Sequence, residues 1–135
     1  MLLVLDTNIV LDLLVFGDPK AQPVSHGLAA GTLHWLATAE MREEFARVLA
    51  YPKLAARVAH HCRGPQPVLA EFDRHARLVD APAKAAVTCG DPDDQKFIDL
   101  AVAHRCMLLS KDWEVLRMRK RLARLQVTAT TCLAA

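Results

Sequence analysis

The sequence predicts an α/β protein, a three-layer α/β/α sandwich in which helices cover both faces of a mainly parallel sheet. Short apolar segments alternate with amphipathic helical segments along the 135 residues, which is the pattern of successive βαβ units. The first segment, Leu2–Leu5, is apolar at every position, as expected for a strand that is covered on both faces. We expect one domain over residues 1–135, because this length suits a single core.

Capping and turn residues set the expected order of elements. Pro23 is tolerated in the first turn of a helix that Gly31 ends, and Thr38 can cap the following helix, which should break or bend near Pro52. A segment rich in glycine and proline at 64–67 separates two further helices. The expected strands are 2–5, 33–37, 78–80, 107–110 and 126–130, and the expected helices are 8–16, 22–30, the segment after Thr38, 54–62, 68–77, 92–105 and 112–125.

Two acidic residues stand where strands of the predicted sheet end. Asp6 directly follows the first strand, and Asp112 follows the strand predicted at 107–110. The carboxyl ends of parallel strands lie at one edge of the sheet, and ligands bind at that edge in open α/β folds. We therefore expect Asp6 and Asp112 to lie close together.

Two further acids belong to helices and share the apolar face of each helix. Glu44 comes three residues after Met41, and Asp94 comes three residues before Phe97. This spacing places each carboxylate on the face that packs inward. Asp91 stands one residue before Pro92 at a helix start, which favours helix capping over metal binding for this side chain.

Clustered carboxylates repel one another, and such groups take up protons or recruit cations. Oxygen ligands select hard ions, so Mg²⁺ or Mn²⁺ is the expected cofactor, whereas zinc favours histidine or thiolate ligands. The four cysteines lack the close spacing of a zinc or redox site. A metal at four carboxylates suits phosphodiester hydrolysis, and no Ser-His-Asp order or glycine-rich phosphate loop indicates another mechanism.

A basic segment near the C-terminal end is the candidate surface for nucleic acid. No acidic residue follows Glu114, and the net charge of +2 is therefore unevenly distributed. Basic residues in the predicted helix 112–125 form a stripe that could contact phosphates beside an acidic metal site. A solvated surface face is the alternative explanation. The residues expected to contact nucleic acid are Arg117, Lys120, Arg121 and Arg124.

Four segments resemble, in order, the acidic motifs of the PIN-domain nucleases, a family of small metal-dependent ribonucleases. The resemblance covers nearly the whole chain. It implies that Asp6, Glu44, Asp94 and Asp112 are the catalytic, metal-binding acids, with Asn8 and Ser110 as polar supports. The segments are Val-Leu-Asp-Thr-Asn at 4–8, Glu-Phe-Ala-Arg-Val-Leu-Ala-Tyr-Pro-Lys at 44–53, Asp-Pro-Asp-Asp-Gln-Lys-Phe at 91–97 and Leu-Leu-Ser-Lys-Asp at 108–112.

The third segment most resembles a branch of toxins from toxin–antitoxin pairs. This resemblance implies an RNA substrate, cleavage products with 5′-phosphate and 3′-hydroxyl ends, a cognate antitoxin protein as partner, and a possible homodimer. We accordingly expect an endoribonuclease that acts as the toxin of such a pair.

Two alternatives to a nuclease remain open at this stage. A catalytically inactive PIN-like module for RNA binding or scaffolding would share the fold, although the chain retains all four acids. A phosphatase of the haloacid-dehalogenase type also begins with a strand ending in Asp, but it needs a second Asp where Asn8 stands. We expect a cytoplasmic protein, because no apolar stretch approaches the roughly 18 residues of a membrane span and the first apolar run is too short for a signal peptide and has no basic prefix.

Overall fold

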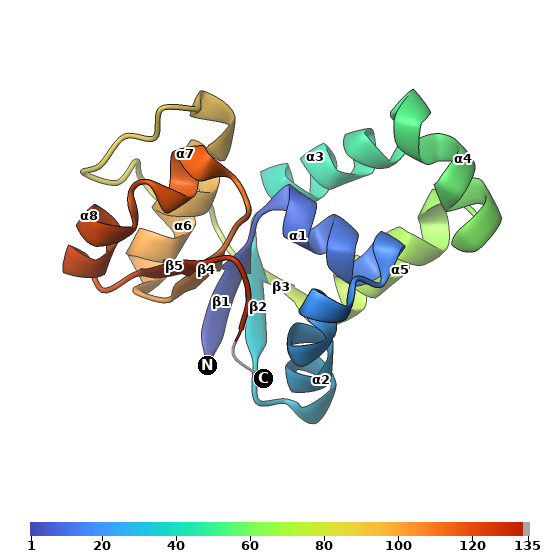
Figure 1. The fold of residues 1–135 in the computed structure, drawn as a ribbon, viewed down its shortest axis with the longest axis horizontal. Coiled ribbons are helices and arrows are strands. Elements are labelled where there is room, and N and C mark those ends of the chain that lie inside the picture. Colours follow the sequence, from blue (N-terminus) through green and yellow to red (C-terminus); the bar gives the residue numbers. More distant parts are fainter. Residues whose placement is uncertain (134–135) are drawn as a thin grey trace.

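The computed structural model describes residues 1–133 and confirms the three-layer α/β/α sandwich (Figure 1). Its five strands form one sheet in the order β3-β2-β1-β4-β5, and every neighbouring pair is parallel. β1 is central, and its residues Leu3, Val4 and Leu5 are buried, as the continuous apolar run predicted. The strands are β1 (Leu2–Leu5), β2 (His34–Ala37), β3 (Ala76–Leu78), β4 (Met107–Leu109) and β5 (Thr128–Thr130).

Helices lie on both sides of the sheet, α1 to α5 on one side and α6 to α8 on the other (Figure 1). This division follows from right-handed crossovers, because the chain moves outward from β1 to β3 and then in the opposite direction from β4 to β5. The helices are α1 (Thr7–Leu11), α2 (Gln22–Ala30), α3 (Ala39–Leu49), α4 (Pro52–His61), α5 (Pro65–His75), α6 (Gln95–His104), α7 (Trp113–Leu116) and α8 (Arg119–Arg124).

The strand order reverses between β1 and β4, and this point positions the site. The crossover from β1 leads to β2 on one side, while β4 pairs with β1 on the other. Such a switch point leaves a crevice at the carboxyl ends of the two strands. The residues that follow β1 and β4 are therefore held at the mouth of this crevice.

The structure corrects three predicted elements. The helix expected at 8–16 is α-helical to Leu11 and continues as a π-helix over Asp12–Phe16, where Asp12 is buried against Lys111 at 2.6 Å. The strand expected at 78–80 begins two residues earlier, because β3 spans Ala76–Leu78, where it pairs with β2. The single helix expected at 112–125 is wrong, because α7 and α8 are separate helices. Val115 in α7 and Met118 between the two helices are both buried in the core.

Within residues 1–133, no helix combines the length and the apolar character that a membrane crossing requires.

Substitution of Leu108, which is fully buried at the centre of β4, tests the packing of the sheet. We expect Leu108→Ala to lower the free energy of unfolding by about 2–5 kcal/mol, because it leaves a cavity between the helical layers. Leu78→Ala, at an exposed position of β3, should change it by only about 0.5 kcal/mol. Urea denaturation measures both values, and equal costs for the two variants would contradict the described core.

Candidate active site

A network of hydrogen bonds joins the ends of β1 and β4. The Asp6 N–H donates to the Leu109 carbonyl at 3.0 Å, and Asp6 Oδ1 accepts from the Ile9 N–H at 3.0 Å, which caps α1. The Ser110 hydroxyl donates to Asp6 Oδ2 and accepts from the Asp112 N–H at 3.0 Å. Ser110 is fully buried, and its hydroxyl joins the Asp6 side chain to the Asp112 backbone.

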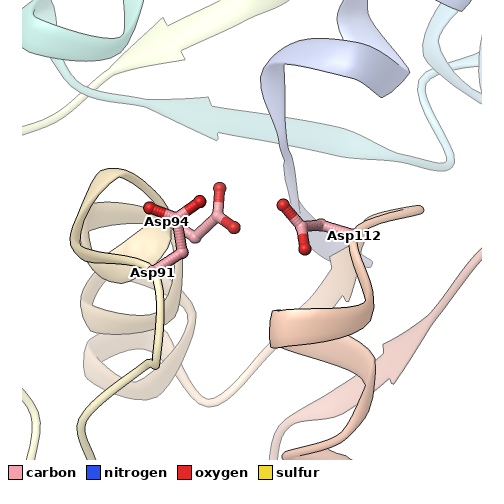
Figure 2. Close-up of side chains that lie close together, drawn as sticks. All are labelled: Asp91, Asp94 and Asp112. Atoms are coloured by element: carbon pink, nitrogen blue, oxygen red, sulfur yellow. The ribbon is translucent and has the colours of Figure 1, made fainter.

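Three carboxylates meet at this edge. Figure 2 shows Asp94 and Asp91 at the start of α6 and Asp112 facing them from the start of α7. One oxygen of each carboxylate lies within 4.8 Å of the others. Asp91 Oδ1 caps the 3-10 turn Pro92–Asp94, which leads into α6, by accepting the Asp93 N–H at 3.0 Å, as its sequence position predicted. The sequence position favours capping over metal binding for Asp91, and the structure shows the cap and also places the side chain in this group.

Asp94 carries the clearest sign of unbalanced charge. Its pKa is raised from the ordinary value of 3.8 to about 8, first by burial and then by interaction with the Asp112 side chain and the charges of Asp91 and Asp6. Within residues 1–133, its Oδ2 is a buried oxygen without a hydrogen-bond partner. Burial also raises the pKa of Asp6, although the hydrogen bonds from Ser110 and Ile9 oppose this effect. Both carboxyls thus favour a proton or a bound cation.

The three-carboxylate group fits a divalent cation. Magnesium binds oxygen at about 2.0–2.1 Å, so two ligand oxygens on opposite sides of the ion lie about 4 Å apart. The oxygens of Asp91, Asp94 and Asp112 lie within 4.8 Å of one another, and the unpartnered Asp94 Oδ2 has a free coordination position. Because all these donors are carboxylates, they suit a hard divalent cation.

Glu44 lies beside this group and is already paired. Its Oε1 accepts from the Thr7 hydroxyl at 3.0 Å, and its Oε2 lies 2.5 Å from Lys96 Nζ. Lys96 also donates to the Asp93 carbonyl at 2.5 Å. The ion pair between Glu44 and Lys96 joins α3 to the start of α6. The sequence did not predict either partner of Glu44. Thr7 lies 37 residues from Glu44 along the chain and Lys96 lies 52 residues from it, and no local spacing indicates contacts over such separations.

A cavity of about 500 Å³ opens beside the acids. Asp6, Glu44 and Asp94 line one part of it, and exposed Asn8 lines its entrance from α1. The rest of the lining is largely apolar and comes from α1, the π-helical segment, α3, the turn that follows it, α4 and α6. The cavity is therefore large enough to admit part of a substrate next to the carboxylates.

The segment before α6 is held by two of that helix's side chains. Gln95 accepts from the Cys89 N–H at 2.6 Å and donates to the Val87 carbonyl at 3.0 Å. Asp99 Oδ1 accepts from the Ala85 N–H and from the Gln95 amide, both at 2.8 Å. These bonds fix the long connection from β3 and so position Asp91 at its end. The sequence carried no signal for this role.

The predicted nucleic-acid residues Arg117, Lys120, Arg121 and Arg124 are all exposed. Arg117 lies 3.6 Å from Glu114, close to the acids at the start of α7. Arg124 instead lies at the end of α8, next to the start of β5 and beside Arg105. Because strands begin at the opposite edge of the sheet from the acids, this basic surface extends away from the carboxylates.

Comparison with known proteins identifies the family. A family model described as PIN domain matches residues 2–113. The chain belongs to the PIN-domain family. The matched part of this PIN domain contains Asp6, Glu44, Asp91, Asp94 and Asp112.

The PIN fold is also found in a similar solved structure, VapBC2 from Rickettsia felis bound to a DNA fragment from their promoter. The identity is 17%, the match covers 96% of this chain and 98% of that chain, and the TM-score is 0.62. At this identity the likeness shows the fold. A comparison with curated proteins finds no match.

The raised pKa of Asp94 predicts a pH dependence of stability for the metal-free PIN domain. As pH rises from the ordinary value of 3.8 to about 8, the unfolded chain loses this proton while the folded protein keeps it, so stability is lost over this interval. The melting temperature of wild type should therefore fall relative to that of Asp94→Asn as pH rises. Asp93→Asn, an exposed acid in the same turn, should keep the wild-type profile. Parallel wild-type and Asp94→Asn profiles would contradict the pKa shift.

Proposed function

We propose that this PIN-domain protein is a metal-dependent endoribonuclease that hydrolyses RNA phosphodiester bonds. The observation that carries the proposal is the group of Asp91, Asp94 and Asp112 at the switch point of the sheet, with an unpartnered buried oxygen on Asp94. Crowded carboxylates beside an open cavity suit a cation that also binds a negatively charged phosphate of the substrate.

In this proposal, Asp91, Asp94 and Asp112 hold Mg²⁺ or Mn²⁺ together with Asp6. A bound divalent ion supplies neutralisation of the charge that develops on the phosphodiester and a lower pKa for the attacking water. Ser110 keeps Asp6 and Asp112 in register through its buried hydroxyl. By resemblance to the family, the products carry 5′-phosphate and 3′-hydroxyl ends.

Lys96 and Glu44 have complementary roles in this proposal. The Lys96 ammonium balances Glu44 at 2.5 Å and keeps that carboxylate from adding a further unpaired charge to the group. The Lys96 side chain is 17% exposed, so it is a cation at the edge of the site rather than on the open surface. From this position it orients Glu44 toward the cavity that both Glu44 and Asp94 line.

We further propose a toxin role in a toxin–antitoxin pair, in the cytoplasm, with a small antitoxin protein as partner and a homodimer as the assembly. Two observations support it. The Asp-Pro-Asp-Asp-Gln-Lys-Phe segment at 91–97 resembles the toxin branch of the family, and the fold is similar to VapBC2 bound to promoter DNA. Co-purification of the protein with the product of the adjacent reading frame tests the partner.

Asp6→Asn tests the nuclease. This change keeps the side-chain shape but removes the charge beside the three-carboxylate group. We expect it to lower Mn²⁺-dependent cleavage of single-stranded RNA by about 10- to 100-fold. Gel analysis of the RNA measures the rate, and circular dichroism checks that the variant is folded.

Wild-type protein with a chelator is the matched control and should leave the RNA intact. Undiminished cleavage by Asp6→Asn would remove Asp6 from the site. Absence of cleavage by wild type with Mg²⁺ or Mn²⁺ would favour the alternative, an inactive PIN-like RNA-binding or scaffolding module.

The basic surface of α8 gives a separate prediction about RNA binding. Replacing Arg121 and Arg124 by Gln should weaken binding to RNA of any sequence, and it should flatten the log–log salt dependence by about 0.7 for each single-strand phosphate that the variant no longer neutralises. Cleavage at saturating RNA should change little, because the carboxylates are untouched. Binding titrations from low to high salt decide it, and an unchanged slope would leave these residues as solvated surface.

A further inference from the structure

We propose that the 500 Å³ cavity beside the acids binds a nucleobase of the RNA next to the scissile phosphate, with Tyr51 as the ring on which the base stacks. This inference rests on the proposed nuclease function and adds the part of the site that holds the substrate. It differs from the proposed contacts of α8, which concern the phosphate backbone.

The cavity joins two kinds of surface. Asp6, Glu44 and Asp94 line the acidic part of the cavity, next to the three-carboxylate group. Phe16 and Tyr51 contribute aromatic rings to the apolar part. A nucleotide has the same division, because its phosphate is charged and its base has an apolar face. A phosphate near the carboxylate-bound cation would therefore bring the neighbouring base to the aromatic part of the same cavity.

Tyr51 is a half-exposed ring on a fixed backbone. Its side chain is 54% exposed, which is unusual for a large apolar group in this chain. Its N–H donates to the Val48 carbonyl at 3.0 Å, and its own carbonyl accepts from the N–H groups of Leu54 and Ala55 at 2.9 Å each. The turn between α3 and α4 thus fixes the backbone that carries the ring, and the ring lines the cavity without being buried. Accessible aromatic rings of this kind stack nucleobases.

Phe16, on the opposite segment, is also held in place. The Arg57 guanidinium carbon lies 4.9 Å from the centroid of its ring, so a cation from α4 covers one face. This contact ties α4 to the π-helical segment and fixes the two aromatic residues relative to each other. The cavity is therefore a defined space between two structural elements.

The segment that carries Tyr51 is rich in basic residues. Between Glu44 and Glu71 the chain contains no acidic residue, and the same stretch contains Arg47, Lys53, Arg57 and Arg63. Lys53 itself lines the cavity. A stacking ring with cations beside it is the arrangement that binds single-stranded RNA, because the rings take the bases and the cations take the phosphates. An apolar segment of a partner protein would use the rings but would leave these cations unpaired.

Tyr51→Ala tests the stacking directly. The probe is a short single-stranded RNA with one 2-aminopurine, whose fluorescence falls when the base stacks, bound to the full chain in Ca²⁺ with the RNA checked for intactness. We expect the fluorescence to fall with wild type, and we expect Tyr51→Ala to abolish this fall and weaken binding by about 5- to 140-fold. Tyr51→Phe retains the ring and should behave as wild type.

Leu78→Ala is the matched control, because Leu78 is similarly exposed at 49% but does not line the cavity. It should change neither binding nor fluorescence. Unchanged binding and fluorescence in Tyr51→Ala would overturn the proposal and leave the cavity for a protein partner. This result is independent of nuclease activity. If wild type shows no Mn²⁺-dependent cleavage, the proposed nuclease function is rejected, while the fluorescence still reports whether a base enters the cavity.

Discussion

Electrostatic repulsion among carboxylates at one edge of the sheet is the constraint on which the site depends. Parallel strands bring Asp6 and Asp112 to the same edge, and α6 adds Asp94 next to them. Burial is the first cause of the raised pKa of Asp94 and of Asp6, and the charge of the neighbouring Asp112 raises both further. The fold therefore has to hold these side chains in place against their mutual repulsion.

Helix capping provides much of that restraint. Asp6, Asp91 and Asp112 each use Oδ1 to accept a backbone N–H at the start of a helical segment. Each such bond fixes a carboxylate through rigid backbone and leaves the second oxygen for other partners. The position of Asp91 before Pro92 predicts a cap, and the structure shows this cap beside Asp94 and Asp112. Because a carboxylate has two oxygens, the capping bond to Oδ1 leaves a second oxygen that is able to bind a cation.

Cations at the edge of the site balance the remaining acids one by one. Lys96 pairs with Glu44 and Lys111 pairs with Asp12, each within 2.6 Å. These pairs leave the Asp91, Asp94 and Asp112 group as the part of the site whose charge is compensated least. The proposed cation would complete this balance.

The sequence alone determined the α/β architecture and the edge where the acids gather. Both follow from short-range patterns, because an apolar run that ends in Asp6, a strand before Asp112 and a cap at Asp91 are visible within a few residues. Helical phase likewise placed Glu44 and Asp94 toward the interior. Only the tertiary structure decided which acids share a group and which are paired. The bonds of Glu44 to Thr7 and Lys96, and the bend that divides α7 from α8, depend on segments brought together by the packing of the whole chain. Local spacing does not encode such distances, because they arise from how the layers fit around the sheet.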